Sequence, residues 1–257
     1  HYIGVPHAVF VPSGRMGLWL ILKACGYPPG SEIVLPAFTY FAIPAVVCAA
    51  GLTPVYADIE PDTYELSPAS VEKVLTGRTR AVVPTHLFGR TCDIDGLKRL
   101  CAPRGIDLVE DCAQSCGAAI GGRMTGALTR AAYFTFGITK NFTTFSGAMV
   151  TCGDEAMHAA LVSAVVGFPP ARRSRLLKEA VVALGMQTAT TRFIFNISLA
   201  PVLRCGAPGK ADLVHRLFEE KAGAIEPGAF ARLGWRPVEA QARAGLRQLL
   251  TIDAKNA

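Results

Sequence analysis

The chain has 257 residues, 51% of them hydrophobic and 18% charged, which excludes a disordered chain and allows one large domain or two smaller ones. The formal net charge is +6, but the basic residues do not gather in one stripe with interleaved aromatics, so we do not expect nucleic-acid binding. None of the eight cysteines belongs to a C-x-x-C pair, which argues against a zinc ribbon and favours reduced thiols in a cytoplasmic protein.

The first expected helix follows a turn of small residues, in the stretch PSGRMGLWLIL at residues 12–22. Glycine lets backbone N–H groups approach an anion closely, and the N-terminus of a helix favours negative charge. The pattern predicts a phosphate site at Ser13, Gly14 and Arg15. Its spacing matches neither the P-loop nor the G-x-G-x-x-G motif, so an ordinary helix N-cap is the alternative interpretation.

Short β-rich runs and helix-like segments then alternate up to about residue 150. We expect strands over residues 32–36, 53–58, 80–86 and 106–111, and helices over residues 41–51, 67–77 and 93–105. The expected N-caps are Ser67, followed by Pro68, and Asp93, and the expected C-terminal stops are Gly77 and Gly105. This alternation predicts an α/β domain with a largely parallel sheet covered by helices on both faces.

Polar residues stand where three of these strands end. They are Asp58, His86 and the pair Glu110 and Asp111. In open α/β sheets, ligands bind beyond the carboxyl ends of the strands, so these side chains are candidates for a binding site. For each of them, a role as a loop or cap residue is the alternative.

The pattern changes after residue 151, and residues 153–235 read as helical and irregular. The uncharged runs at residues 180–191 and 193–203 are each too short to span a bilayer. Because the basic stretch ARRSR at residues 171–175 precedes them, they could lie on a membrane surface. Packing against the protein's own core is the preferred interpretation, and we do not expect membrane contact.

Lys140 is the only charged residue of the stretch YFTFGITKNFTTFSG, residues 133–147. A buried ammonium group without a counter-ion is costly, so a lysine in such a place shifts its pKa or takes part in chemistry. A lysine that reaches solvent from a turn is the alternative.

Other features favour a lysine that forms a Schiff base with pyridoxal phosphate (PLP). This cofactor needs a lysine, an acid at its ring nitrogen and an anchor for its phosphate. Asp111, with Gln114 three residues on, follows an apolar strand, and Thr135 offers a hydroxyl five residues before Lys140. Tyr40, at the end of another strand, is the candidate for an aromatic ring over the cofactor. No metal site is expected.

Six blocks in sequence order resemble the DegT/DnrJ/EryC1/StrS family of fold-type I PLP enzymes. The blocks are SGRMGLWLIL, VLPAFTYFA, GLTPVYADIEPDTYELSP, TRAVVPTHLFGR, VEDCAQSCGA and FTFGITKNFTTFSGAMVT. They cover residues 1 to about 152, and a weaker match begins at Trp235. The resemblance implies the large α/β domain of the PLP-transferase fold, with a mainly parallel central sheet flanked by helices. It also implies an aminotransferase that acts on a nucleotide-linked keto-sugar.

The resemblance gives three residues a role in the chemistry of the cofactor ring. Lys140 would form the Schiff base and, once released, move a proton between the cofactor and the substrate. Asp111 would keep the ring nitrogen protonated, which makes the ring an electron sink. Gln114 would contact the ring hydroxyl.

The resemblance also implies the residues that hold the rest of the cofactor. Gly14 and Arg15, through their backbone N–H groups, and Thr135 would bind the phosphate, and Tyr40 would stack on the ring. Thr135 stands where the family usually has serine, and because the hydroxyl is retained we expect binding to be retained as well.

The sequence departs from the family's pattern at three places. Arg130 stands where an aspartate is common, and FSGA at residues 145–148 replaces a Gly-Glu-Gly-Gly run. We expect both changes to lie near the active site and to alter substrate fit. Near Trp235 there is no asparagine of the kind that reaches a phosphate across the subunit interface in relatives.

The first residue is His1 and not methionine, and the last residues read as an unfinished amphipathic helix, so we expect a fragment. Residues 1–152 would form the PLP-binding domain without its N-terminal part. Residues 153–235 would form a helical continuation or insertion, and residues 236–257 the start of a small C-terminal domain that is largely missing.

The leading prediction is a cytoplasmic, homodimeric aminotransferase of amino-sugar or polysaccharide biosynthesis, with glutamate as the amino donor. One alternative is a PLP-dependent sugar dehydratase, which Lys140 disfavours because the related dehydratases carry histidine in place of the lysine. Another is a PLP-binding or regulatory protein without turnover.

Overall fold

The computed structural model describes residues 2–137, 140, 142–189, 191, 196–197, 200, 234–236, 238, 241, 243 and 248. The chain divides into two compact units. The first comprises residues 1–171 and 225–257 and contains the sheet, and the second comprises residues 172–224.

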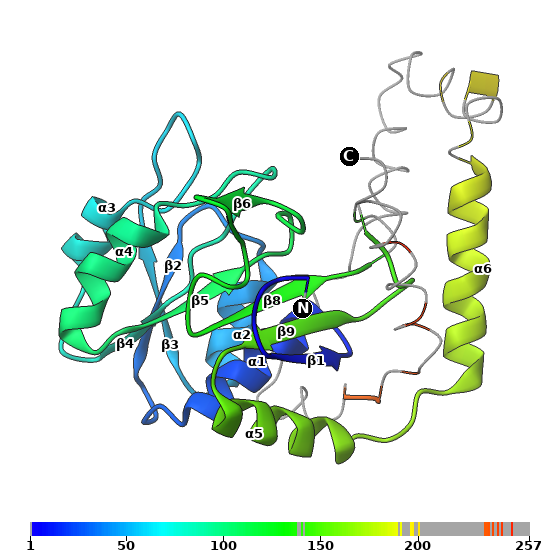
Figure 1. Ribbon diagram of the computed structural model, residues 1–257, viewed down its shortest axis with the longest axis horizontal. Helices are drawn as coiled ribbons and strands as arrows, with labels where there is room; N and C mark the ends of the chain where they lie inside the picture. The colour runs from blue at the N-terminus through cyan, green and yellow to red at the C-terminus, as the bar shows by residue number, and fades with distance from the viewer. Residues whose placement is uncertain are drawn as a thin grey trace. The chain divides into compact units, whose positions relative to one another are not determined.

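A seven-stranded sheet forms the centre of the first unit, in the order β1-β9-β8-β5-β4-β2-β3 (Figure 1). The strands are β1 (His7–Val11), β2 (Glu32–Pro36), β3 (Thr53–Ala57), β4 (Thr79–Val82), β5 (Asp107–Asp111), β8 (Ala131–Thr135) and β9 (Ala148–Cys152). Strands β3, β2, β4, β5 and β8 run parallel to one another, whereas β9 runs antiparallel to both β8 and β1. The expected mainly parallel sheet is therefore confirmed.

Helices cover both faces of this sheet (Figure 1). They are α1 (Gly14–Cys25), α2 (Ala42–Ala49), α3 (Pro68–Val74), α4 (Ile94–Cys101), the 3-10 turn η1 (Ala102–Arg104) and α5 (Glu155–Val166). A separate two-stranded ribbon consists of β6 (Ala119–Ile120) and β7 (Arg123–Met124). The second unit contains α6 (Arg173–Ala189).

The alternation of side chains along the strands separates two cores. Ile33 and Leu35 of β2 pack with residues of α1 and α2, while Val34 between them packs with residues of α3 and α4. Successive residues of a strand point to opposite faces, so an unbroken apolar strand serves both helical layers. Helix α5 belongs to the first of these cores, through Met157 and Leu161.

The expected helix starts are confirmed, and of the two expected stops Gly105 is confirmed and Gly77 is wrong. The Ser67 hydroxyl accepts a hydrogen bond from the Ser70 N–H, and the Asp93 carboxylate accepts one from Gly96. Helix α3 ends at Val74, because the next residue has an extended backbone, so Gly77 is not its cap. Gly105 ends the 3-10 turn that follows α4, with the left-handed φ of 64° that glycine tolerates.

The strand expected over residues 80–86 ends four residues early, at Val82. Pro84 has no N–H to donate to a sheet ladder, which explains the break. Thr85 still forms an isolated parallel bridge to Asp111, and the His86 N–H donates to the Asp111 carbonyl. The chain after β4 therefore remains attached to the carboxyl end of β5.

Several described apolar side chains of helix α6 are exposed, and the expected packing of residues 180–191 against the core stays a prediction. Leu177, Val181 and Leu184 are each about two-thirds exposed. Most of residues 193–203 lies outside the described residues. Among the described helices, none combines the length and hydrophobicity that crossing a bilayer requires.

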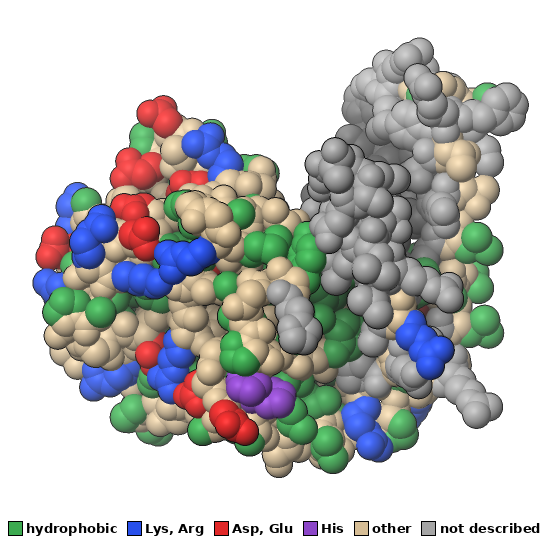
Figure 2. All heavy atoms as spheres, in the orientation of Figure 1, with side chains coloured by type: hydrophobic (Ala, Val, Ile, Leu, Met, Phe, Trp, Pro, Cys, Tyr) green, Lys and Arg blue, Asp and Glu red, His purple; other side chains and the backbone are tan. Residues whose placement is uncertain are grey.

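The described surface mixes charges of both signs. On the face shown in Figure 2, acidic and basic side chains alternate over the region of α3 and α4. Each of these helices provides the acid of an exposed ion pair: Glu72 of α3 pairs with Arg104 at 3.3 Å, and Asp95 of α4 pairs with Arg123 at 3.5 Å. This part of the surface has no single-sign stripe of the kind that binds nucleic acid.

The seven cysteines of the described residues are all free thiols, as the sequence predicts. The eighth, Cys205, lies outside the described residues.

Candidate active site

The N-terminus of α1 meets the carboxyl end of β8. The Ser13 hydroxyl caps the helix by accepting a hydrogen bond from the Met16 N–H at 3.2 Å. A β-carbon added to Gly14 would lie 2.2 Å from Cγ2 of Thr135. The first turn contains no acidic residue. The backbone N–H groups at a helix start point beyond the helix and favour an anion, so Gly14, Arg15 and Thr135 surround a position that suits a phosphate.

Asp111 ends the neighbouring strand β5 and is only 3% exposed. One short turn connects it with Thr135, because Ala113 donates its N–H to the Asp111 carboxylate at 3.0 Å and accepts the Thr135 hydroxyl at 3.5 Å. Burial raises the pKa of Asp111, and this increase is opposed by the Tyr133 hydroxyl, the Ala113 N–H and the Lys140 charge. A buried carboxylate is ready for a cationic partner that replaces the lost water.

Tyr133 stands beside Asp111 in the register of β5 and β8. Its hydroxyl is buried and has no hydrogen-bond partner of ordinary geometry, although it lies close enough to Asp111 to stabilise the carboxylate charge. The Tyr133 hydroxyl is therefore unsatisfied. Unsatisfied buried polar atoms are rare in folded proteins and mark places where a further group can bind.

Glu110 and Asp111, adjacent in sequence, point to opposite faces of β5 and have different roles. The Glu110 carboxylate accepts four hydrogen bonds, from the N–H groups of Gly126 and Leu128, the Thr129 hydroxyl and Nε2 of His86. His86 and Glu110 are both fully buried. Glu110 is therefore saturated by the protein, whereas Asp111 accepts a bond from the Ala113 N–H at the edge of the sheet.

The hydrogen bonds of His86 fix its tautomer. Its Nδ1 accepts a bond from the Cys92 N–H at 3.1 Å, so the ring hydrogen is on Nε2 and is donated to Glu110, also at 3.1 Å. His86, Glu110 and Cys112 are close enough together to bind a metal ion. Because the hydrogen bonds already occupy His86 and Glu110, we interpret the group as structural. His86, a candidate from its place after a strand, thus holds the loop of residues 126–129 through Glu110.

Gln114 is exposed and lies three residues beyond Asp111 in the sequence. Its side chain is held by the loop that follows β4. Its Oε1 accepts a hydrogen bond from the Phe88 N–H at 3.2 Å. Phe88 has a φ of 54°, which is unusual for a residue other than glycine. The loop after β4 therefore fixes the side-chain oxygen of Gln114 near the carboxyl end of β5.

Tyr40 follows β2, and its ring packs against Phe41 with a centroid distance of 4.5 Å. It is 42% exposed, so part of its surface is accessible to solvent after the end of β2. Asp58, the other candidate in this region, is exposed and accepts the N–H of the next residue, Ile59. The alternative interpretation of Asp58 as a turn residue is thus supported.

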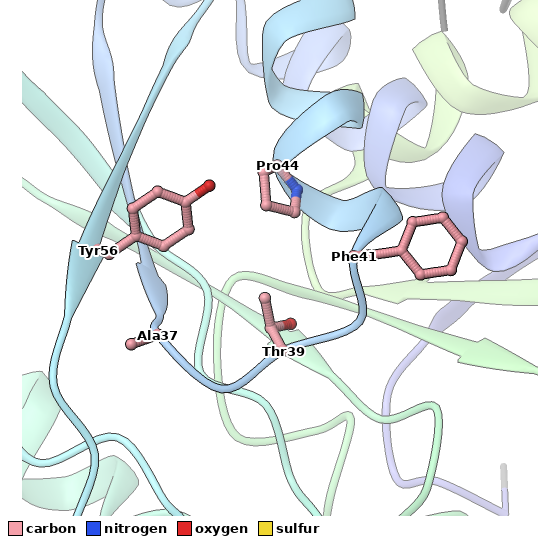
Figure 3. Close-up of a pocket in the computed structure, with 5 residues that line it drawn as sticks. All are labelled: Ala37, Thr39, Phe41, Pro44 and Tyr56. Atoms are coloured by element: carbon pink, nitrogen blue, oxygen red, sulfur yellow. The ribbon is translucent and has the colours of Figure 1, made fainter. Parts of the chain in front are cut away.

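An open cavity of about 500 Å³ lies beside the Tyr40 loop. It is lined by Ala37, Thr39, Phe41, Pro44 and Tyr56 (Figure 3). Figure 3 shows Thr39 between the rings of Tyr56, from β3, and Phe41, from the start of α2. The sequence did not predict this cavity, since its lining is mostly apolar and lacks a motif.

Lys140 lies in the connection between β8 and β9 and is half-buried. Its backbone N–H donates to the Gly137 carbonyl at 3.0 Å, which closes a turn. Its positive charge lowers the pKa of Asp111, so its ammonium group lies within electrostatic range of that carboxylate. Residues 138, 139 and 141 lie outside the described residues.

The expectation that Arg130 lies near the active site is wrong. Arg130 precedes β8, and its guanidinium pairs with Asp107 at the start of β5 and, at 3.9 Å, with Asp154. Thr135 stands at the other end of the five-residue strand β8, about 17 Å away at the usual rise per residue. Arg130 therefore belongs to the edge of the sheet opposite the candidate site.

The fold and the site together define an α/β protein with a helix start that suits an anion, a buried acid at the carboxyl end of β5 and a lysine in the connection after β8. The model of the DegT/DnrJ/EryC1/StrS aminotransferase family matches residues 1–193, and the chain belongs to this family.

Two curated relatives illustrate the similarity. The chain is 42% identical over 153 residues to an L-glutamine:2-deoxy-scyllo-inosose aminotransferase of Streptomyces fradiae, covering 60% of this chain and 36% of that protein. It is 37% identical over 158 residues to a GDP-perosamine synthase of Caulobacter vibrioides, covering 62% and 43%. The chain thus spans well under half the length of these two relatives.

A solved structure agrees with the fold. The PLP form of the sugar aminotransferase Spr1654 from Streptococcus pneumoniae superposes with a TM-score of 0.62 at 29% identity. The match covers 64% of this chain and 47% of that one.

Proposed function

We propose that the chain is the PLP-binding part of an aminotransferase that aminates a keto-sugar linked to a nucleotide. The observation that supports this most is the contact of Gly14 with Thr135, next to the buried carboxylate of Asp111. A phosphate anchor and an acid for a ring nitrogen are the two fixed needs of this cofactor.

The residues present fit the cofactor. A side chain larger than hydrogen at position 14 would fill the space beside Thr135. The Tyr133 hydroxyl is unsatisfied, and burial raises the pKa of Asp111. A bound cation such as a protonated ring nitrogen would stabilise the charged form of the Asp111 carboxylate. Gly14, Arg15 and Thr135 would hold the phosphate, Asp111 the ring nitrogen, Gln114 the ring hydroxyl and Tyr40 a face of the ring.

When bound, the cofactor supplies an electron sink that stabilises negative charge on the substrate carbon. Asp111 maintains this property, because its negative charge favours the protonated ring nitrogen. Lys140 would hold the resting cofactor through Nζ and, once released, would take up and return the proton at the substrate carbon. The net reaction moves the donor's amino group to the sugar's carbonyl carbon, and the donor becomes a keto acid.

The identities of the amino donor and of the amino acceptor are also proposed. Glutamate is the proposed donor and a nucleotide-linked keto-sugar the proposed acceptor, which agrees with the name of the GDP-perosamine synthase. The name of the Streptomyces fradiae relative favours a second candidate, with glutamine as donor and a keto-cyclitol as acceptor. A sugar dehydratase is disfavoured by Lys140 at the position of the cofactor lysine. We further propose a homodimer in the cytoplasm.

The proposal is tested on the purified protein loaded with PLP. Absorbance of the lysine–cofactor linkage should appear, and glutamate or glutamine should bleach it as the amino group is transferred. The donor that bleaches faster identifies the specificity. A band that no amino donor changes would contradict turnover and favour a binding or regulatory protein. The absence of any band would contradict the cofactor itself.

A further inference from the structure

The connection between β8 and β9 is closed at its base, and the structure describes its residues 136–137, 140 and 142–147. Phe136 closes its base, because its N–H donates to the Gly147 carbonyl and its carbonyl accepts the Thr144 N–H. Phe142 anchors the loop from inside, with 3% of its surface exposed and its ring 4.9 Å from that of Phe136. Lys140 lies within this closed segment, two residues before Phe142.

Two glutamines from the C-terminal part of the chain hold the other side of the loop. Gln248 binds both backbone groups of Thr143, because its Oε1 accepts the Thr143 N–H at 3.0 Å and its Nε2 donates to the Thr143 carbonyl. Gln241 is 3% exposed, and its Nε2 donates to the hydroxyl of Ser146 at 3.1 Å and to its carbonyl at 3.4 Å. Residues 241 and 248 both have helical backbone and belong to the same compact unit as the loop.

The two glutamines hold the segment in which the backbone is strained. Phe145, between Thr143 and Ser146, has a φ of 70°, which costs energy for a residue other than glycine. The Thr143 hydroxyl supports this conformation by accepting the Phe145 N–H at 3.0 Å. A strained residue persists only where its surroundings determine its conformation, and the glutamines hold its surroundings on both sides.

We propose that Gln241 and Gln248 are positioning residues that hold the loop of Lys140 in the conformation that presents its amine to the cofactor. This inference rests on the proposed function for the role of Lys140, but the hold on the loop itself does not. Each glutamine acts through the backbone of the loop and not on the substrate. The C-terminal segment thus contributes to the site from more than 100 residues away in the sequence.

Whether the two glutamines restrain the loop is tested first without cofactor, by hydrogen–deuterium exchange of the amides of residues 142–147. In Gln248→Ala the Thr143 amide should exchange about tenfold faster, because it loses its acceptor. In Gln248→Glu the Thr143 amide should keep part of its protection, since a carboxylate still accepts this bond but cannot donate to the Thr143 carbonyl. In Gln241→Ala the exchange near Ser146 should increase. Arg99→Ala, on α4, is the control and should leave the loop unchanged.

Exchange of the β2 peptide, residues 32–36, is the reference that distinguishes a local change in the loop from destabilisation of the whole domain. Faster exchange confined to the loop supports the proposal. Unchanged loop exchange in both alanine variants would overturn it, and so would an equal increase in the loop and in β2, because that pattern reports global destabilisation.

The link to Lys140 is tested by the affinity for PLP and by turnover. Gln248→Ala should lower kcat about tenfold with little change in KM for the donor, because misplacement of a reacting group raises the barrier. A smaller loss is expected in Gln248→Glu, because glutamate keeps one of the two bonds to Thr143. A kcat that stays unchanged while the loop loosens would overturn the positioning role. If the wild-type protein does not bind PLP, the proposed function fails, while the exchange measurement still decides whether the glutamines hold the loop.

Discussion

Gly14 and Thr135 approach so closely that a β-carbon on Gly14 would lie 2.2 Å from Cγ2 of Thr135. The two residues are 121 positions apart, yet they bring the start of α1 against the end of β8. Thr135 has a short, β-branched side chain with few alternative rotamers, so it cannot give way easily. Glycine at position 14 is therefore a requirement of the phosphate position and not only of the helix start.

We predict that Gly14→Ala displaces Thr135 and weakens PLP binding by at least tenfold, with a loss of stability of about 1–3 kcal/mol from overpacking. Titration of the apoprotein with PLP and urea denaturation measure the two effects. Gly77→Ala is the matched control, because a β-carbon there meets no atom within 4 Å. Equal PLP affinities for the two variants would contradict a phosphate site at Gly14.

Asp111→Asn should separate stability from function. Burial raises the pKa of Asp111, so above the ordinary pKa of an aspartate the native state binds more protons than the unfolded state. The stability of the cofactor-free protein should therefore fall as pH rises through the interval between the unfolded and native pKa values of this group. Asparagine removes this dependence and should make the apoprotein more stable at pH 7.

The same variant should bind PLP about ten- to a hundredfold more weakly, because it loses a charged hydrogen bond of about 1.5–3 kcal/mol. Unfolding curves from pH 4 to 8 and PLP titrations check both effects. A wild-type apoprotein whose stability rises over this interval while Asp111→Asn is less stable throughout would contradict the assignment of Asp111 as a poorly solvated acid.

Glu110→Gln should mainly destabilise the fold. The four hydrogen bonds to the Glu110 carboxylate come from donors, and an amide NH2 group cannot accept from them. We expect a loss of about 3 kcal/mol in the free energy of unfolding, measured in urea. The control is Glu72→Gln on the surface, where the pair with Arg104 is exposed and a change below about 0.5 kcal/mol is expected. Similar losses for both variants would show that the buried network is not structural.

Arg130→Ala tests the corrected position of this residue. Because Arg130 binds Asp107 and Asp154 at the edge of the sheet opposite Asp111, its removal should leave KM for donor and acceptor within about twofold. The loss of partly exposed ion pairs should cost no more than about 1 kcal/mol of stability. A large increase in KM for the sugar would restore the sequence-based interpretation that Arg130 shapes the substrate site.

The sequence predicts β2 to the residue, because an apolar run bounded by Gly30 and a proline leaves little choice. It does not delimit β1, β8 and β9, of which β8 and β9 flank the connection that contains Lys140. The run of β8 continues into the apolar loop at Phe136, so composition does not mark where pairing ends. One of these three strands, β1, has no partner close in sequence, since it pairs with β9 across more than 130 residues.

The sequence predicts which residue types form the site, but not how they are arranged in space. Strand alternation shows that Glu110 and Asp111 face opposite sides, but only the packing of α1 shows which side is the site. The roles of Gln241 and Gln248 could not be predicted, because polar residues in an amphipathic helix usually face water. Their partners are backbone groups of a distant loop, which carry no signal in the sequence.

The most direct test of the account is to locate the lysine that bonds to the cofactor. The protein is incubated with PLP, reduced with borohydride, digested and analysed by mass spectrometry. The account predicts about one label per chain, on Lys140. The label should be absent from Lys140→Ala and reduced when the amino donor is added before borohydride. A label spread over surface lysines such as Lys73 and Lys98, with Lys140 unmodified, would contradict it.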